Sequence, residues 1–466
     1  MSDYNRYQSP YSWRYASEEM RYIWSENNKR RLWRQLWVAL AQAESEYGLV
    51  LPDQVEDLRA HAEEIDIPRA LQIEAEIHHD LMAEVKAFGE KCTLGTGIIH
   101  LGATSMDIED NADALRLRQS LDLILEKLGA LLMIFAKKIK EFADLPVIAF
   151  THLQPAEPST LGYRLALYAQ DLLADFEVLY RTRLEIRGKG FKGAVGTSAS
   201  YGELVGADQI ENLENRLSEL LGIPFFPVAS QTYPRKQDYF VLNGLAGMGA
   251  SLYKFAFDLR LLQSPTIGEL SEPFGEKQVG SSAMPFKRNP INAEKMDSLA
   301  RLLAQMPEVA WQNAAHSHLE RTLDDSANRR TLLPEAFLIS DELLKTASRI
   351  LRGLQVNKSA IARNLATYAP FASTERVLMA LAKSGANRQD MHERLRSHAM
   401  IAWQAVREGQ PNPLVNLLAQ DPMITGSLSA EKVKELMDID QYTGAAPQRA
   451  RELARTIQDR IQSKEE

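Results

Sequence analysis

The stretch from Gly280 to Pro290, Gly-Ser-Ser-Ala-Met-Pro-Phe-Lys-Arg-Asn-Pro, reveals more about this chain than any other segment. It follows a region rich in Pro and Gly and precedes a long helix-compatible run, so we predict a loop at a helix start. Its two hydroxyls, lysine, amide and backbone N–H groups suit a carboxylate, or the charge that develops when a proton leaves the carbon beside one. A Gly/Ser-rich hinge with solvated charges is the alternative that composition alone favours.

The residue order GSSxMPxKxNP resembles the signature loop of the fumarase/aspartase superfamily, whose members eliminate fumarate from a succinyl group. The resemblance covers nearly the whole chain. It implies a mainly α, three-domain superfamily lyase fold, whose central long-helix bundle assembles into a tetrameric helical core with each active site built from three subunits. The expected domains are an N-terminal helical domain, a central long-helix bundle domain and a C-terminal helical domain, at residues 1–111, 112–356 and 357–466.

Composition is that of a soluble globular protein, with 45% hydrophobic and 25% charged residues among 466. No segment reaches the length of a membrane span, and the polar N-terminus has no signal-peptide core. Because Cys92 is the only cysteine, an intrachain disulfide and a Cys-based metal cluster are excluded. This cysteine usage favours a cytoplasmic location for the protein. The net charge of -8 argues against nucleic-acid binding, although a local cationic pocket remains compatible with an anionic small substrate.

Helical spacing dominates the chain, and period-2 patterns typical of strands are scarce. Ser25 is a candidate N-cap for a helix that ends at Gly48. Apolar residues on much of the surface of the longest helices indicate a bundle whose outside is also covered, by other subunits. From about residue 357 the sequence predicts shorter helices, broken by residues such as Pro370 and Gly385. The long Leu- and Ala-rich helices are predicted at 112–143, 159–187, 237–263, 291–318 and 332–352.

Polar side chains gather in the segments that connect these helices, which are rich in Gly, Ser, Thr and Pro. This distribution predicts a rigid scaffold that presents functional loops. The connecting segments are 92–110, 144–158, 188–203 and 264–290.

One connecting segment contains Thr151-His152-Leu153-Gln154-Pro155-Ala156. Histidine titrates near neutrality and can protonate a leaving group, although an isolated histidine more often hydrogen-bonds within its loop. The TH-x-QPA context resembles the second loop of the superfamily in its adenylosuccinate lyase version. By this resemblance His152 is the general acid, Thr151 contacts substrate, and Glu294 orients His152 from another subunit. Taken alone, Glu294 is a favourable acid in the first turn of a helix.

The segment from Gly102 to Asn111 precedes a predicted helix, and its hydroxyl and carboxyl groups are natural N-caps. It also resembles the first loop of the superfamily, in which hydroxyls bind a succinyl carboxylate. The resemblance gives that role to Thr104 and Ser105.

The sequence Ile77-His78-His79-Asp80 lies in a helix-compatible segment. Adjacent histidines project about 100° apart on a helix, so they make a poor pair of metal ligands and no metal site is predicted. The pair His79-Asp80 resembles the His-Asp of adenylosuccinate lyases. This implies that His79 contacts substrate and assists catalysis, and that Asp80 belongs to the substrate site.

The Arg-rich run from Glu320 to Arg330 distinguishes among branches of the superfamily. Arginine suits bidentate phosphate recognition, although Asp324 and Asp325 also permit a salt-bridged turn. The run resembles the nucleotide-binding segment of adenylosuccinate lyases, most nearly their animal-type form, whereas fumarase, aspartase and argininosuccinate lyase bind no phosphate. The chain departs from that form at Lys295, where the animal-type enzyme has arginine. The residues thereby assigned to the nucleotide substrate are Arg14, Tyr15, Gln231, Arg321, Ser326 and Arg330.

The implied reaction is β-elimination of fumarate from adenylosuccinate, which gives AMP, and from succinylaminoimidazole carboxamide ribotide. Ser281 is the implied base, Ser282 contacts substrate, and Lys287 and Asn289 stabilise the carbanion. Such a reaction needs no cofactor, and none is expected. The expected partners are small nucleotides and the other subunits of a homotetramer, with no nucleic acid and no membrane.

Two alternatives remain at this point. One is another fumarate-releasing lyase, similar to argininosuccinate lyase, against which His79 and the run from Arg321 to Arg330 argue. The other is an inactive protein that keeps the fold for a structural role. The joint presence of the candidate catalytic residues argues against it, namely His152, Ser281, Lys287, Asn289 and Glu294.

Overall fold

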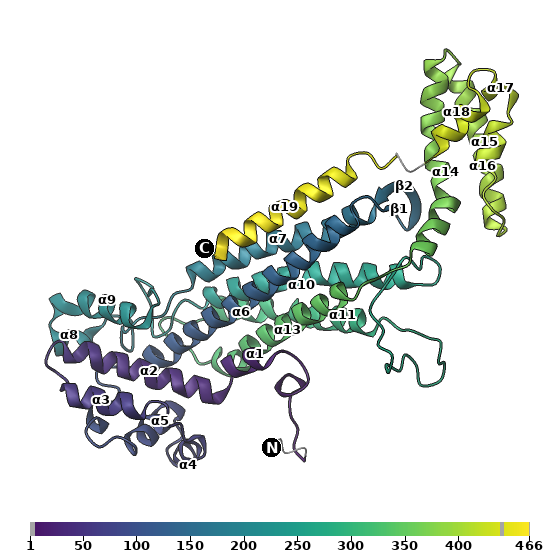
Figure 1. Cartoon of the computed structure of the whole chain (residues 1–466). Coiled ribbons are helices and arrows are strands. Elements are labelled where there is room, and N and C mark those ends of the chain that lie inside the picture. Colours follow the sequence, from purple (N-terminus) through teal and green to yellow (C-terminus); the bar gives the residue numbers. More distant parts are fainter. Residues whose placement is uncertain (1–4, 439–441, 466) are drawn as a thin grey trace. The chain divides into compact units, whose positions relative to one another are not determined.

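The computed structural model describes residues 5–438 and 442–465, without the side chains of residues 464 and 465, and it is mostly helical (Figure 1). This confirms the predicted helical class. The chain divides into two compact units, which we call the first unit (residues up to 128, 175–250 and 298–345) and the second unit (129–174, 251–297 and 346 onward). The three-domain division expected from the sequence stays a prediction.

Five long helices have part of their length in each unit. Their Leu- and Ala-rich sequences favour helix and supply many of the buried apolar side chains. They are α6 (Ser105–Glu141), α7 (Leu161–Glu185), α10 (Lys236–Gln263), α11 (Ile291–Leu303) and α13 (Ser326–Arg352).

The other elements of the first unit are short or medium helices. The α-helices are α1 (Glu18–Ile23), α2 (Glu26–Ser45), α3 (Pro52–His61), α4 (Ile67–Ile77), α5 (Asp80–Gly89), α8 (Ala199–Val205), α9 (Ile210–Leu221) and α12 (Met306–Ala315). The 3-10 helices are η1 (Pro10–Ser12), η2 (Thr96–Ile98) and η3 (Ala207–Gln209).

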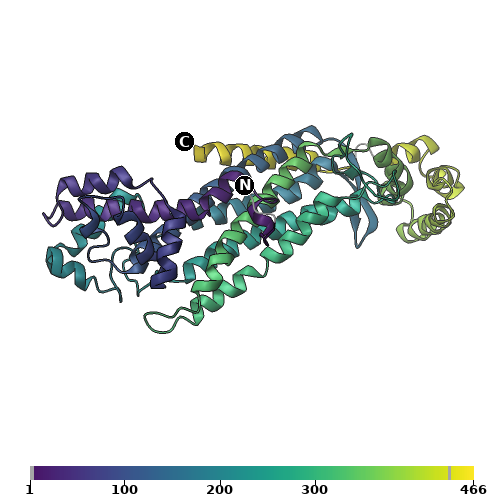
Figure 2. The ribbon, with the colours of Figure 1, turned by 90° about the horizontal axis from the view of Figure 1, so that it is seen from below.

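Helix α2 is the centre of the hydrophobic core of the first unit. The Oγ of Ser25 accepts the backbone N–H of Asn28 at 3.1 Å, which confirms the predicted N-cap. Trp33 and Trp37 of α2 are buried with Phe88 of α5 in one apolar cluster. Helices α3 and α9 pack against α2, and both views show them beside it (Figures 1 and 2). The core of the first unit is therefore built around α2.

The second unit contains two short antiparallel strand pairs and the C-terminal helices. Helix α14 packs against the β1–β2 pair and against α15, α16 and α18 (Figure 1). The strands are β1 (Pro146–Thr151), β2 (Gln154–Thr160), β3 (Leu270–Ser271) and β4 (Gln355–Val356). The helices are α14 (Lys358–Lys383), α15 (Arg388–Arg407), α16 (Leu414–Ala419), α17 (Pro422–Thr425), α18 (Ala430–Met437) and α19 (Ala446–Glu465). No helix within residues 5–438 and 442–465 is long and apolar enough to cross a membrane.

Several predicted element bounds are wrong. The helix predicted at 291–318 is two helices, α11 and α12, because Pro307 takes a first-turn position, where its missing N–H costs nothing. Pro370 does not break a helix, since α14 runs through it for 26 residues. Part of the segment 144–158, predicted as a connecting loop, forms β1 and the start of β2.

Glu44 of α2 lies in the core of the first unit with 1% of its surface exposed. Neither carboxylate oxygen has a hydrogen-bond partner in the described part of the chain. Burial disfavours the charged form and raises the pKa of Glu44 to about 8. The protein therefore carries a neutral, protonated carboxyl in its core at neutral pH.

Because the pKa of Glu44 is higher in the folded than in the unfolded chain, its contribution to stability is fully present below the unfolded pKa of 4.5 and is lost as pH rises through about 8. We expect stability to fall by about 1 kcal/mol per pH unit across this window from Glu44 alone. Urea denaturation of wild type and Glu44→Gln at a series of pH values measures this. A wild-type slope that survives in Glu44→Gln would contradict the assignment.

Candidate active site

The predicted signature loop lies between β3 and α11 and holds Ser281 in a defined setting. The Oγ of Ser281 accepts hydrogen bonds from the backbone N–H groups of Met284, at 3.1 Å, and Ala283, at 3.3 Å. Two such donors stabilise negative charge on an oxygen, so the loop favours removal of the hydroxyl proton. Ser282 and Lys287, from the same loop, expose their side chains to solvent.

The two ends of this loop are in contact. A Cβ atom at Gly280 would lie 2.1 Å from the carbonyl oxygen of Lys287, so only glycine fits there. The Nδ2 of Asn289 donates to the carbonyl oxygen of Gly280 at 3.2 Å. In this chain, Asn289 therefore closes the loop that carries Ser281.

Glu272 anchors the helix that follows the loop. Its buried carboxylate accepts the backbone N–H groups of Asn292 and Ala293, both at 3.1 Å, and the Nδ2 of Asn292 at 2.9 Å. Negative charge is favoured at a helix N-terminus, so Glu272 stabilises the first turn of α11. Sequence reasoning missed Glu272, because it lies 20 residues before the N–H group of Asn292 that it accepts.

His152 lies at the tip of the hairpin formed by β1 and β2. Thr151 pairs with Gln154, which leaves His152 and Leu153 as a two-residue turn with φ values of 54° and 58°. Turns with two positive φ values suit hairpins but normally use Asn and Gly, so this turn is strained. His152 also lines a pocket of about 830 Å³ in the second unit, whose wall includes Lys254.

Glu294 lies in the first turn of α11, with its side chain 49% exposed and 4.0 Å from the guanidinium of Arg260. No hydrogen bond or ion pair joins Glu294 to His152 within residues 5–438 and 442–465. A single chain therefore does not orient His152 through Glu294.

Thr104 and Ser105 lie at the start of α6, which begins at Ser105 and thus earlier than predicted. The N–H of Thr104 donates to the Oδ2 of Asp107 at 3.0 Å, a helix-capping contact that extends the helix towards the N-terminus. Asp107 is fully buried, forms an ion pair with Lys189, and accepts the N–H of Lys192 at 3.1 Å. The half-buried residues Thr104 and Ser105 are thus held in place at the helix start by the contacts of Asp107.

The two adjacent histidines do not lie within a helix, and that interpretation is wrong. Helix α4 ends at Ile77, and His78 adopts a left-handed φ of 55°, a conformation that commonly terminates helices. His79 then caps α5, its Nδ1 accepting the N–H of Met82 at 3.4 Å. The break leaves the His79 side chain 47% exposed beside Asp80.

His100 is a second histidine of the first unit, which sequence reasoning missed. Its Nδ1 accepts the Nε1–H of Trp37 at 3.1 Å, and burial lowers the pKa of its imidazole. Its φ of 69° marks a strained backbone. No sequence pattern revealed that conformation.

Asp80, Arg321, Ser326 and Arg330 line one pocket of about 130 Å³ in the first unit. Asp80 and Arg330 form an ion pair at 2.9 Å. The structure therefore brings together side chains from α5, from the segment before α13 and from α13 itself, among them three of the residues assigned to the nucleotide by resemblance, whose role stays a prediction. Further cations in the lining are Lys29, Arg116 and Arg329.

Glu109 of α6 lines the same pocket and was not predicted. Burial, and then the nearby carboxylate of Asp80, raise the pKa of Glu109 to about 8. At neutral pH this pocket therefore holds a protonated carboxyl among its cations.

Gln231 and the pair Arg14-Tyr15 lie elsewhere in the first unit. The N–H of Gln231 donates to the carbonyl oxygen of Glu320 at 3.2 Å, beside Arg321 in the chain. Arg14 is exposed, and Tyr15 is half-buried. Ala16, which follows Tyr15, is held against α13, because its N–H donates to the Oε2 of Glu342 at 3.0 Å.

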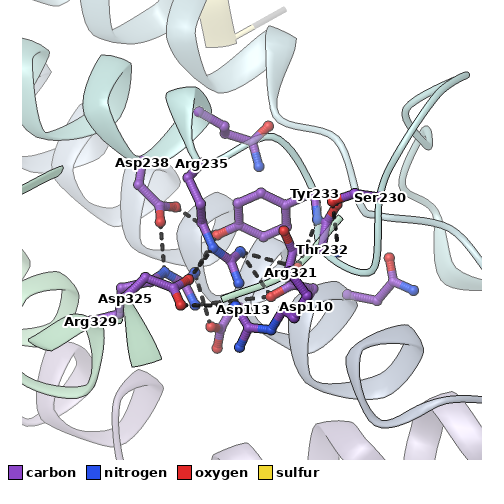
Figure 3. A network of polar contacts seen from close by, with 12 residues as sticks. Asp110, Asp113, Ser230, Thr232, Tyr233, Arg235, Asp238, Arg321, Asp325 and Arg329 are labelled. Atoms are coloured by element: carbon purple, nitrogen blue, oxygen red, sulfur yellow. Dashed lines mark hydrogen bonds and ion pairs between the residues drawn. The ribbon is translucent and has the colours of Figure 1, made fainter. Parts of the chain in front are cut away.

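Beneath the Arg-rich run lies a buried network of carboxylates and guanidinium groups (Figure 3). Arg329 donates to Asp238 at 2.7 Å and to the hydroxyl of Tyr233 at 2.6 Å, and lies 3.3 Å from Asp113. Its side chain is 7% exposed, whereas that of Arg330 is 61% exposed. Arg329 therefore belongs to the buried network, although it also lines the pocket; sequence reasoning assigned Arg330 but not Arg329 to the nucleotide site.

The predicted site residues thus fall into two sets, one in each unit. The set in the first unit is Arg14, Tyr15, His79, Asp80, Thr104, Ser105, Gln231, Arg321, Ser326 and Arg330. The set in the second unit is Thr151, His152, Ser281, Ser282, Lys287, Asn289 and Glu294.

Family models match most of the chain. The model described as "Lyase" matches residues 9–303, and the model described as "Adenylosuccinate lyase C-terminus" matches residues 370–453.

Similar proteins agree with these models. The chain is 42% identical to the adenylosuccinate lyase of Saccharomyces cerevisiae over 96% of this chain and 94% of that protein. It is 41% identical to the adenylosuccinate lyase of Schistosoma mansoni over 90% and 89% of the two chains. Among solved structures, the 3-carboxy-cis,cis-muconate lactonizing enzyme from Pseudomonas putida superposes with a TM-score of 0.85 at 27% identity, covering 97% of this chain and 100% of that one.

Proposed function

Because the chain belongs to the adenylosuccinate lyase family, we propose that it eliminates fumarate from adenylosuccinate to give AMP. The same site is proposed to cleave succinylaminoimidazole carboxamide ribotide, in purine nucleotide biosynthesis. The observation that carries this proposal is the setting of Ser281, whose Oγ accepts two backbone N–H groups in a loop with the family motif.

Ser281 is the proposed base. Its alkoxide removes a proton from the carbon beside a succinyl carboxylate, and the electron pair of that C–H bond moves towards the carboxylate. The Lys287 ammonium and the Asn289 amide stabilise the charge that develops there. Ser282, Thr104 and Ser105 offer hydroxyls to the succinyl carboxylates.

His152 is the proposed acid. As the bond between carbon and nitrogen breaks, its electron pair leaves with nitrogen, and His152 donates the proton that completes the amine. The strained turn supports this role, since it holds the imidazole at a hairpin tip. Glu294 orients His152 from another subunit, and Thr151 contacts the substrate.

The pocket of the first unit is the proposed nucleotide site. Its convergent positive charge, from Arg321 and Arg330 beside the hydroxyl of Ser326, suits the phosphate. Asp80 pairs with Arg330 in the structure and so helps to place it. The remaining proposed contacts to substrate come from Arg14, Tyr15, His79 and Gln231.

The active form is proposed to be a homotetramer in the cytoplasm, with active sites shared between subunits. Exposed apolar side chains on the long helices support an assembly, because large apolar surfaces on a soluble protein mark contact sites. Leu167 and Leu184 of α7 are 51% and 55% exposed, and Phe240 of α10 is 52% exposed.

The activity is tested by incubating purified protein with adenylosuccinate and following fumarate and AMP together. We expect equal release of both products. No release from folded protein on either purine substrate, together with release from another succinyl-amine such as argininosuccinate, would overturn the substrate assignment.

Sharing of sites predicts complementation between inactive variants. Ser281→Ala and His152→Ala tetramers, each nearly inactive, are mixed, dissociated and reassembled, and we expect about a quarter of wild-type activity. A site regains activity when it takes His152 from one variant and Ser281 from the other. Each variant carried through the same treatment alone is the control. Hybrid tetramers without activity would contradict shared sites.

A further inference from the structure

Asp325 lies between two guanidinium groups, one inside the nucleotide pocket and one outside it (Figure 3). Its Oδ1 accepts the Nη1–H of Arg321 at 2.8 Å, and its Oδ2 accepts the Nε–H of Arg235. The Nε of Arg321 is buried and has no hydrogen-bond partner among the residues described. Asp325 therefore fixes one edge of the Arg321 guanidinium and leaves other donors uncommitted.

Arg235 is enclosed in the protein and does not line the pocket. Its Nη1 donates to both oxygens of Asp110, at 3.0 and 3.1 Å, and Asp110 also accepts the N–H of Tyr233 at 2.7 Å. One guanidinium thus holds Asp325 through Nε and Asp110 through Nη1. This needs the planar fork of arginine, because a lysine ammonium is a single point of charge on a flexible stem.

These contacts join two segments at both ends. At one end the N–H of Gln231 donates to the carbonyl oxygen of Glu320, and at the other Arg235 binds Asp325. Gln231, proposed to bind substrate, forms the first connection through its N–H. Arg321, also proposed to bind substrate, lies in the chain between the two connections. Arg235, through Asp325, therefore holds the segment that carries Arg321 against the segment that carries Gln231.

We propose that Arg235 is a positioning residue for nucleotide recognition, an inference that rests on the proposed function. Through Asp325 it holds the Arg321 guanidinium in the orientation that receives the anionic group of the nucleotide. Arg235 itself touches no substrate. Because a charged, geometrically matched pair forms only when the fork points at the anion, loss of the orientation weakens binding of the nucleotide part selectively.

The test compares Arg235→Lys and Asp325→Asn with wild type. We expect AMP to bind about tenfold more weakly to both variants by calorimetry, and KM for adenylosuccinate to rise by about the same factor. We expect kcat to stay within about threefold of wild type, since the groups that act on the succinyl part are unchanged. Inhibition by fumarate should be unaltered. A purely structural role would instead lower the fraction of active protein and leave both affinities unchanged.

The matched control is Arg34→Lys. Arg34 is another buried arginine of the first unit, and its Nε donates to the Oε1 of Glu84 at 2.8 Å. It should leave AMP affinity unchanged. If Arg235→Lys does not fold, Asp325→Asn decides. AMP affinities equal to wild type in the folded variants, or no AMP binding by wild type, would overturn the proposal. Should wild type release no fumarate, the proposed reaction fails, whereas selective weakening of AMP binding would still support the positioning role.

Discussion

Replacing Ser281 by alanine is expected to lower kcat on the order of 10³-fold, the range in which a positioned proton-transfer group acts. The substitution removes the atom that takes the proton. It should leave the unfolding midpoint unchanged, because the N–H groups of Ala283 and Met284 lie in an exposed loop where water replaces the lost acceptor. Fumarate release at saturating adenylosuccinate and thermal unfolding of the same samples measure both effects.

The control is Glu276→Gln, an exposed residue of the same segment with no proposed role. It should retain wild-type kcat. Full turnover by folded Ser281→Ala protein would remove Ser281 as the base and would leave the two N–H donors as a turn of structural importance alone.

Replacing Arg329 by leucine is expected to cost about 3–5 kcal/mol of stability, the usual effect of removing one partner of a buried ion pair. The change leaves Asp238 in the protein interior without its cation, removes one of the two arginine partners of Asp113, and leaves the hydroxyl of Tyr233 without its donor. Urea denaturation at equal protein concentration measures the loss, since the midpoint of an oligomer depends on concentration.

The adjacent variant Arg330→Leu provides the comparison. Its side chain is mostly exposed and, within the part of the chain that the structure describes, its ion pair is with Asp80, so the substitution should cost at most about 1 kcal/mol of stability. It should instead raise KM for adenylosuccinate. Equal unfolding midpoints for Arg329→Leu and wild type would show that the buried network does not stabilise the fold.

Much of the fold could be predicted because apolar spacing specifies long helices. The helix that begins after Ser25 follows this rule, and its cap is formed as expected. The errors in the predicted helix bounds have local causes. Helix α6 starts earlier than predicted because the side chain of Asp107, in its first turn, accepts the N–H of Thr104. The break at His78 was missed because His78 adopts a left-handed φ, a conformation that the sequence usually signals with glycine.

The β1–β2 hairpin was missed for two reasons. Its strands contain Pro146, Pro155 and Pro158, and proline normally argues against a strand. In a pair of only two strands each has a free edge, so proline can be accommodated. The turn itself, His152-Leu153, lacks the Asn-Gly signal by which such turns are recognised.

The sequence predicts the candidate site as a set of residues but not as an arrangement, and their roles stay predictions. Motif order identified Ser281, His152 and the Arg-rich run. Motif order assigned Arg330 and not Arg329 to the site, but it did not reveal that Arg329 is the buried one, because adjacent residues on a helix project about 100° apart and only the packing around the helix decides which is buried. Nor could it reveal Glu272 or Arg235, whose partners lie far along the chain.

The contact between Gly280 and the carbonyl of Lys287 makes the intervening segment a closed ring of backbone. A ring resists internal deformation more than an open strap does, since its ends cannot separate without losing the contact and the Asn289 hydrogen bond. If this loop moves, Ser281 and its two N–H donors should therefore move together as one rigid segment. The distance from Oγ to these donors is then a property of the ring, whatever the position of the ring over a substrate.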